Sequence, residues 1–176
     1  MAEIALGAML AIAAVHRIAG AQTPAAATLS SKDVQVLSRA LAFMQPPPAV
    51  GELAVLYLAD NEASRRDAEA ISAQIGSGLR VGNAELRPRL VDAATLTGGR
   101  FPVVITAAGA NGPQVGAAIR AMHALCVTAE LAAVQSGLCT MAVRSEPRVE
   151  IVVNHAAAAA AGVEFAAAFR MMIREI

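Results

Sequence analysis

The chain has 176 residues, enough for one ordinary domain, and its 14 basic and 14 acidic side chains give a formal net charge of zero. This balance argues against a nucleic-acid partner, because phosphate binding needs clustered Lys and Arg, and Lys32 is the single lysine. Hydrophobic residues make up 56% of the chain, yet it has no Trp and one Tyr, so aromatic platforms for bases or sugars are not expected.

The first 21 residues are typical of an export signal. Residues 4–15 are all apolar or small, and Ala19-Gly20-Ala21 is a small-residue cleavage site. Such a run rises only about 18 Å as a helix, less than the roughly 30 Å of a bilayer core, so a membrane span is not expected. The alternative is an apolar first helix, because Met1-Ala2-Glu3 brings no basic residue. We expect a flexible lead-in at residues 22–31 and a periplasmic domain, not embedded in the membrane, at residues 32–176.

The rest of the chain alternates helical spacing with short apolar runs. Near-continuous apolar runs between turn signals predict buried parallel strands, and Pro113 fits the first turn of a helix. The expected elements are, in order, a helix at 32–44, a strand at 53–59, a helix at 62–75, strands at 86–91 and 101–106, a helix at 113–125, a strand at 126–129, a β-hairpin of 138–144 and 148–154, and helices at 156–161 and 163–176. This order predicts the α/β class: a single compact domain with a mostly parallel sheet flanked by helices, a C-terminal β-hairpin and a terminal helix.

Two turns that follow predicted strands are candidate ligand sites. Asp60 and Asn61 follow the first strand, and Gly109, Asn111 and Gly112 follow the strand at 101–106. Open α/β sheets bind ligands at the carboxyl ends of their strands, and helix N-termini attract anions. The glycines do not match a dinucleotide or phosphate-loop motif, so ordinary turn and cap chemistry is the alternative.

His123, Cys126 and Cys139 are the other candidate groups for chemistry. The His-x-x-Cys pair has no further ligand at metal-binding spacing, and no third group is present to orient a Cys–His nucleophile. The sequence therefore predicts no metal, no cofactor and no enzyme activity. In an exported protein a Cys126–Cys139 disulfide is expected, with two half-buried thiols or an intermolecular bridge as alternatives. Met171 and Met172 are expected to lie on the terminal helix and to pack into the protein core.

Both ends of the domain resemble the YfiR/HmsC-type family of periplasmic proteins. Residues 36–46 (VLSRALAFMQP) resemble the family's opening, in which a helix runs into an aromatic–Trp–Pro step. Residues 137–143 (GLCTMAV) and 148–154 (RVEIVVN) resemble its Cys-bearing strand and the strand that closes on Asn. Residues 158–169 resemble the Ala-rich segment and the final helix that follow in the family. The match covers most of residues 33–175.

The chain departs from the family at two points. Gln45-Pro46 stands in place of Trp-Pro, and Ala132 and Ala133 lie where many members carry a cysteine that pairs with the equivalent of Cys139. Cys126 could replace that partner, or the bridge could be lost.

The resemblance implies a non-enzymatic regulator that holds the periplasmic sensor domain of a membrane diguanylate cyclase inactive and so lowers cyclic-di-GMP. Binding would use an apolar patch, and a homodimer is compatible with this function. The second hypothesis is a small-molecule binding module related to one lobe of periplasmic solute-binding proteins, with the two candidate turns lining its cleft.

Overall fold

The computed structural model describes residues 28–96 and 99–176. The expected signal peptide (1–21) and residues 22–27 of the expected lead-in lie outside the described residues. Leu29 is only 1% exposed and Ser30 caps the first helix, so residues 28–31 belong to the folded domain rather than to a flexible lead-in. Within the described ranges, no helix has the length and apolar character that crossing a membrane requires.

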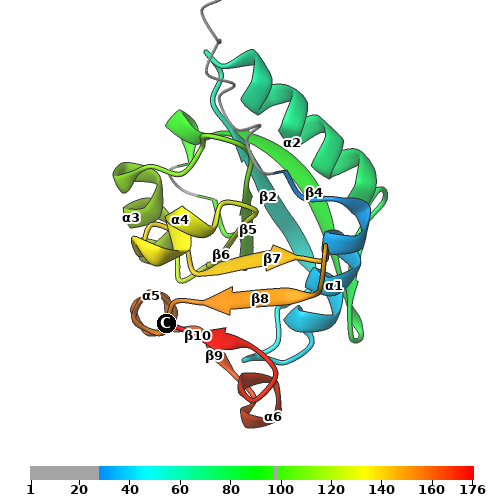
Figure 1. Ribbon diagram of the computed structural model, residues 1–176. Helices are drawn as coiled ribbons and strands as arrows, with labels where there is room; N and C mark the ends of the chain where they lie inside the picture. The colour runs from blue at the N-terminus through cyan, green and yellow to red at the C-terminus, as the bar shows by residue number, and fades with distance from the viewer. Residues whose placement is uncertain (1–27, 97–98) are drawn as a thin grey trace, which may run out of the picture.

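An eight-stranded sheet forms the centre of the molecule, in the order β10-β8-β7-β6-β5-β2-β4-β3 (Figure 1). Its strands are β2 (Gly51–Tyr57), β3 (Leu79–Val81), β4 (Ala84–Asp92), β5 (Val103–Thr106), β6 (Leu125–Thr128), β7 (Met141–Arg144), β8 (Glu150–Val153) and β10 (Arg174–Glu175). The β3–β4 and β7–β8 pairs are antiparallel and the other five pairs are parallel. The α/β class with a mostly parallel sheet and a C-terminal hairpin is confirmed.

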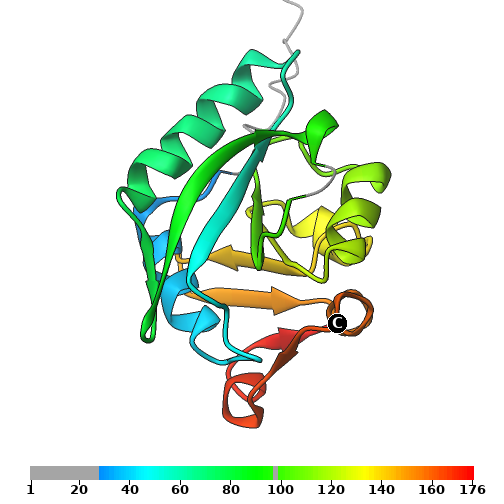
Figure 2. The same ribbon diagram turned by 180° about the vertical axis from the view of Figure 1, so that it is seen from behind.

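Helices cover both faces of this sheet (Figures 1 and 2). Helices α1 (Ser31–Leu41) and α2 (Glu62–Ile75) share one apolar core with Leu53 and Val55 of β2. Helices α3 (Pro113–Ala121) and α4 (Leu131–Gln135) share a second core with Ala54 and Leu56 of the same strand. A strand buried on both faces needs apolar residues at consecutive positions, which explains the unbroken run in β2.

Helix α2 has the bounds that its sequence predicts. Asn61 caps its N-terminus by accepting a hydrogen bond from Ser64 N, and Gly76 ends it with a φ of 67°, a conformation that favours glycine. Helix α1 begins with a capping box in which Ser30 and Asp33 each bond the other's backbone N–H. It ends at Leu41, before the predicted residue 44, because Met44–Gln45 form strand β1.

The predicted helix at 163–176 is wrong. This segment contains β9 (Glu164–Phe165), the short helix α6 (Ala167–Arg170) and β10. β9 pairs with β1, placing Met44 opposite Phe165, and the ring of Phe169 stacks on Phe43 with centroids 5.1 Å apart. Pairing with distant strands outweighs the helical propensity of the Ala-rich sequence.

The two methionines of this segment also differ from expectation. Met171 is 86% exposed and Met172 is 66% exposed, so neither packs in the core. They lie between α6 and β10, where the chain leaves the helix to reach the sheet. The turn before the last strand thus places two long apolar side chains in solvent.

Helix α3 is shorter than predicted, and the sequence pattern does not predict helix α4. Helix α3 ends at Ala121, and His123 has a φ of 53°, which stops the helix before β6 begins at Leu125. Helix α5 (His155–Ala161), capped by Asn154, agrees with the prediction within one residue. A single 3-10 turn, η1 (Ala93–Thr95), follows β4.

Candidate functional site

The two candidate turns lie at one edge of the sheet. β4, the next strand parallel to β2, lies on one side of β2, whereas β5 lies on the other side, so the strand order reverses between β2 and β5. The carboxyl ends of both strands meet there, and Ala107 N donates a hydrogen bond to Leu56 O at 2.9 Å. Such a reversal is where open α/β sheets bind ligands.

Asn111 ties together the ends of two neighbouring strands. Thr106 Oγ1, at the end of β5, donates to Asn111 Oδ1 at 2.9 Å. Asn111 Nδ2 donates to Thr128 Oγ1, at the end of β6, at 3.0 Å and to Glu130 Oε2 at 3.1 Å. Both threonines are buried. The side chain of Asn111 is therefore held by three protein groups.

Two carboxylates bind the backbone amides of the same turn. Gly109 N, at a residue whose φ is 73°, donates to Glu130 Oε1 at 2.7 Å. Ala108 N donates to Asp67 Oδ2 of α2, also at 2.7 Å, and the hydroxyl of Thr28 donates to the other oxygen of Asp67. These amides are the groups that would receive an anion. Because the protein's own carboxylates occupy them, an anionic ligand would have to displace a like charge.

The turn after β2 is also satisfied internally. Asn61 Oδ1 accepts from Ser64 N at 3.1 Å, and the buried Ser64 Oγ accepts from Leu58 N at 3.1 Å. Asp60 is exposed beside them, and Gly112 precedes α3 without a side-chain cap. Among the five candidates, the structure thus gives Asn61, Gly109 and Asn111 structural hydrogen bonds, and Gly112 O accepts from Gly116 N in the first turn of α3.

Sequence reasoning missed four members of this network: Asp67, Thr106, Thr128 and Glu130. One signal was available, because the two apolar runs VVIT and LCVT both end in threonine at the last position of a buried strand. A polar side chain in such a position needs a hydrogen-bond partner. Nothing in the sequence indicates that Asp67, 41 residues before Ala108, reaches the same turn.

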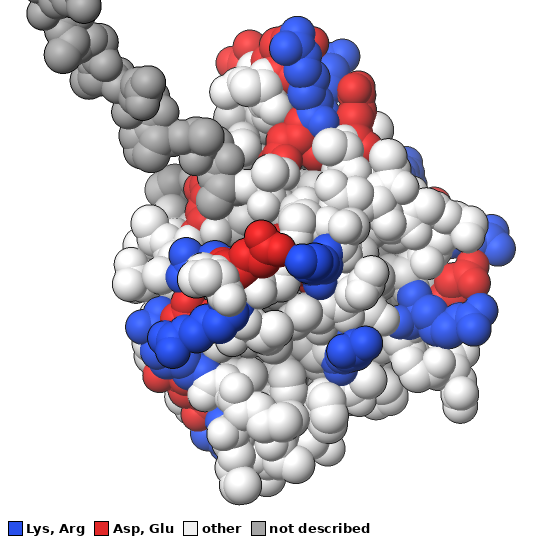
Figure 3. All heavy atoms as spheres, turned by 45° about the vertical axis from the view of Figure 1, so that its right-hand side comes forward, with Lys and Arg blue, Asp and Glu red and all other residues white. Residues whose placement is uncertain are grey.

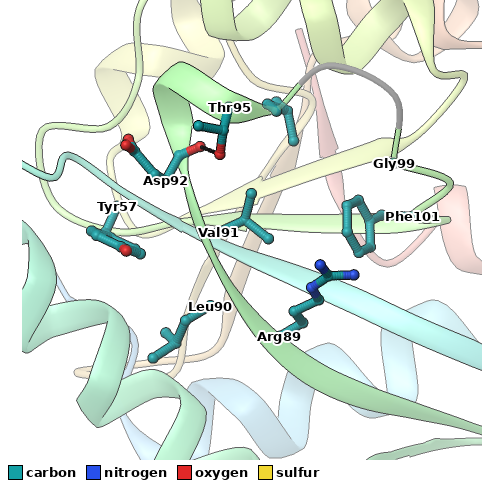
Figure 4. A pocket seen from close by; sticks show the side chains of 9 residues that line it. Tyr57, Arg89, Leu90, Val91, Asp92, Thr95, Gly99 and Phe101 are labelled. Atoms are coloured by element: carbon teal, nitrogen blue, oxygen red, sulfur yellow. Dashed lines mark hydrogen bonds between the residues drawn. The ribbon is translucent and has the colours of Figure 1, made fainter.

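Two pockets lie near this edge of the sheet. The switch-point pocket, of about 330 Å³, is mostly apolar and lies between the turn after β2, η1 and the first turns of α3. Its lining consists of Leu58, Ala93, Ala94, Leu96, Gln114, Val115 and Ala118. The edge groove, of about 440 Å³, runs along the outer side of β4. In Figure 4, Tyr57 and Phe101 lie on opposite sides of Val91 in this groove.

The predicted disulfide is present. Cys126 of β6 is bonded to Cys139, which follows α4, with 5.0 Å between their Cα atoms. Both cysteines are buried in the core beneath α3 and α4. In this state Cys126 offers no thiolate to His123. Among the described residues no cluster of three His, Cys, Asp or Glu side chains could hold a metal ion.

Asp33 joins α1 to the β7–β8 turn. Its carboxylate accepts from Ser30 N at 2.7 Å and from Ser145 N at 2.5 Å. Burial raises the pKa of Asp33, but the hydrogen bonds from Ser145 and Ser30 outweigh it, so that the pKa lies below its ordinary value. Beside it, Lys32 Nζ lies 2.6 Å from Glu146 Oε1 in an exposed ion pair.

Charges of both signs are mixed on the surface. On the face in Figure 3, acidic and basic side chains lie next to each other, and much of its lower part carries neither. Most of the ion pairs, such as Arg66–Glu62 and Arg89–Glu52, are solvent-exposed. That face therefore offers no extended patch of one sign for a polyanion.

Comparison with known proteins defines the fold. No family model matches the chain, and no curated protein matches it. Among solved structures, it is similar to an ABC domain in complex with L-Trp from Streptococcus pneumoniae, with a TM-score of 0.57 and 14% identity. The match covers 83% of this chain and 60% of that chain, so the present chain spans about 60% of its neighbour's length. At this identity the likeness shows a shared α/β fold.

Proposed function

We propose that the protein is an exported, non-enzymatic regulator of the YfiR kind. It binds the periplasmic sensor domain of a membrane diguanylate cyclase and lowers cyclic-di-GMP output. The observation that carries this proposal is the closed network at the carboxyl edge of the sheet, where Asp67 and Glu130 occupy the amides of the β5–α3 turn. A turn filled by the protein itself favours binding through the outer surface.

The two blocks that resemble the family lie together in the fold, which supports the proposal. β1, in the first block, pairs with β9, in the second. Asp33 of α1 also bonds to the turn between β7 and β8. The resemblance thus covers one contiguous part of the molecule rather than two separate segments.

An exposed apolar surface is available at the C-terminal end of the same part. Met171 and Met172 are its most exposed members, and Ile176 is 44% exposed. Methionine side chains are flexible and polarizable, and they are common on surfaces that bind other proteins. We assign the contact with the sensor domain to this C-terminal Met surface.

Co-purification and cyclic-di-GMP measurements test the proposal. Tagged protein isolated from the periplasm is expected to bring down a diguanylate cyclase, and deletion of its gene is expected to raise cyclic-di-GMP. The double variant Met171→Ser/Met172→Ser should lose both effects. The control Val50→Ser removes another exposed apolar side chain, 74% exposed, at a different place and should keep both. An unchanged cyclic-di-GMP level on deletion, with no cyclase recovered, would contradict the proposal.

A second candidate function is solute binding. The switch-point pocket favours it, because it lies where α/β sheets bind ligands, and the structural neighbour holds L-Trp. Thermal-shift measurements with L-Trp, other amino acids, sugars and anions test it. A saturable shift that Ala118→Leu abolishes, by filling the pocket, would support this function. Ala117→Leu, on the exposed side of α3, is the matched control.

A further inference from the structure

Residues 87–92 of β4 form an unpaired edge of the sheet. β4 pairs with β2 along residues 86–92, but on its other side β3 reaches only residues 84–86. Within the described ranges, no strand lies beside residues 87–92 on that side. The edge groove runs along this stretch and is lined by Arg89, Leu90, Val91 and Asp92. Leu90 is 41% exposed there.

The register of the sheet determines which backbone groups face outward. In a parallel pair, a residue bonds to the residues before and after its register partner, and alternate residues face opposite sides. Leu56 O faces β5, so residues an odd number of positions away, such as Leu53 and Tyr57, face β4. Each of these bonds to the two residues of β4 that flank its register partner, and the register partner itself faces away from β2. Pro88 and Asp92 are the register partners, so they and Leu90, which alternates with them, present their backbone groups to the free edge.

One of these outward carbonyls is already bonded. Thr95 Oγ1 donates to Asp92 O at 3.0 Å, and proline has no backbone N–H. The groups left for a partner are therefore Pro88 O, Leu90 N, Leu90 O and Asp92 N. They are two donors and two acceptors, arranged evenly about Leu90.

We propose that two copies of this chain pair edge to edge through residues 87–92 of β4, in antiparallel orientation about a two-fold axis at Leu90. Leu90 then exchanges two hydrogen bonds with Leu90 of the second copy. Asp92 N of each copy donates to Pro88 O of the other. The missing donor at Pro88 falls opposite the carbonyl of Asp92 that Thr95 has already bonded. All four free groups of each copy are thus paired. The pattern of free donors and acceptors is therefore complementary to itself, as pairing between two identical strands requires.

The side chains fit the same register. Leu90 contacts Leu90 of the second copy on one face of the joined sheet. On the other face Arg89 lies opposite Val91, so that no two arginines are directly opposed. Moving the axis to Arg89 would oppose the two arginines. Proline and charged residues often protect free edges from pairing. Here, Pro88 lies opposite Asp92 O of the second copy, which already accepts a hydrogen bond from Thr95 and needs no further donor.

Cysteine cross-linking tests both the pairing and its register. Facing residues of a hydrogen-bonded antiparallel pair have Cα atoms about 5.5 Å apart, a separation that a disulfide can span. The native cysteines are bonded to each other, so L90C adds the single free thiol among the described residues. Under mild oxidation of the purified protein, L90C should give a covalent dimer.

R89C is the matched control. The side chain at position 89 is 60% exposed, so random collisions would cross-link R89C at least as readily as L90C. In the proposed register, however, position 89 faces position 91 and R89C should stay uncross-linked, whereas the double variant R89C/V91C should cross-link. Equal cross-linking of R89C and L90C, or none in L90C, would overturn the proposal.

Sedimentation equilibrium gives a second, independent readout. Leu90→Pro removes one donor at an outward position equivalent to that of Pro88, and it should weaken dimerisation at least tenfold. Leu90→Ala keeps the donor and should weaken it less. An unchanged dimerisation constant for folded Leu90→Pro would contradict the proposal, and if that variant does not fold, the cross-linking result decides. The pairing does not depend on the proposed regulatory function.

Discussion

The turn after β5 and the free edge of β4 lie near the same end of the sheet, and each has backbone amides that no neighbouring strand pairs. In the turn, Asp67 and Glu130 bind the amides of Ala108 and Gly109, and Asn111 bonds two buried threonines. At the edge, the groups of Leu90 and Asp92 N have no neighbouring strand within the described residues. The position at a strand-order reversal therefore does not by itself make a binding site. What matters is whether the polar groups are already paired.

This contrast predicts that changes in the closed turn affect stability, whereas changes on open surfaces affect assembly. The largest effect is expected for the disulfide in the core beneath α3 and α4. Replacing both Cys126 and Cys139 by Ser should lower the free energy of unfolding by about 3 kcal/mol, because the bridge restricts the unfolded chain. Urea denaturation of the wild-type and double-serine proteins measures this difference. A loss well below about 1 kcal/mol would show that the bridge contributes little to folding.

The next effect is expected for Asn111. Asn111→Ala leaves Thr106, Thr128 and Glu130 without their common partner, and should cost about 2 kcal/mol of unfolding free energy. Urea denaturation again provides the measurement. Gln74→Ala, at an exposed position of α2, is the control and should change stability by less than about 0.5 kcal/mol. If Asn111→Ala were as stable as the control, the turn would not be the closed network described above.

Asp33 should give a smaller effect that depends on pH. Because its pKa is lowered in the folded protein, the charged form stabilises the fold at pH values above its ordinary pKa of 3.8. That contribution is lost as the pH falls below 3.8 through the folded pKa. Asp33→Asn should cost about 1 kcal/mol at neutral pH, and the difference from wild type should shrink in acid. Thermal unfolding from pH 7 to pH 2 measures this change. A difference that stays constant across this range would contradict the prediction.

The smallest effect on stability is expected at the C-terminal Met surface. Met171→Ser/Met172→Ser removes side chains that are 86% and 66% exposed, so the unfolding free energy should change by less than about 0.5 kcal/mol. The same variant should lose partner binding. A large loss of stability, measured by urea denaturation, would mean that these side chains pack against the fold.

The elements that could be predicted from sequence are those decided by local pattern. Helix α2 has its own cap at Asn61 and its own stop at Gly76, and β2 and β5 are apolar runs that only a buried strand explains. The segment at 163–176 could not be predicted in this way. Its strands form because β1, far away in the chain, and β8, on the other side of α5, offer them partners.

The candidate site divides in the same manner. The position of both turns at one edge follows from the alternation of strands and helices, which the sequence contains. The occupation of the turn by Asp67 and Glu130 depends on how α2 and the segment after β6 approach it, which no spacing indicates. The sequence predicts the disulfide with two alternatives beside it, and only the fold places Cys126 and Cys139 close together.

Cyclic-di-GMP measured in cells that carry three forms of the protein tests the proposed function most directly. The wild type and Ala118→Leu, which fills the switch-point pocket, should both keep cyclic-di-GMP low. Met171→Ser/Met172→Ser should lose this repression while remaining folded. The reverse result, with repression lost in Ala118→Leu and kept in the methionine variant, would contradict regulation through the C-terminal Met surface and favour solute binding.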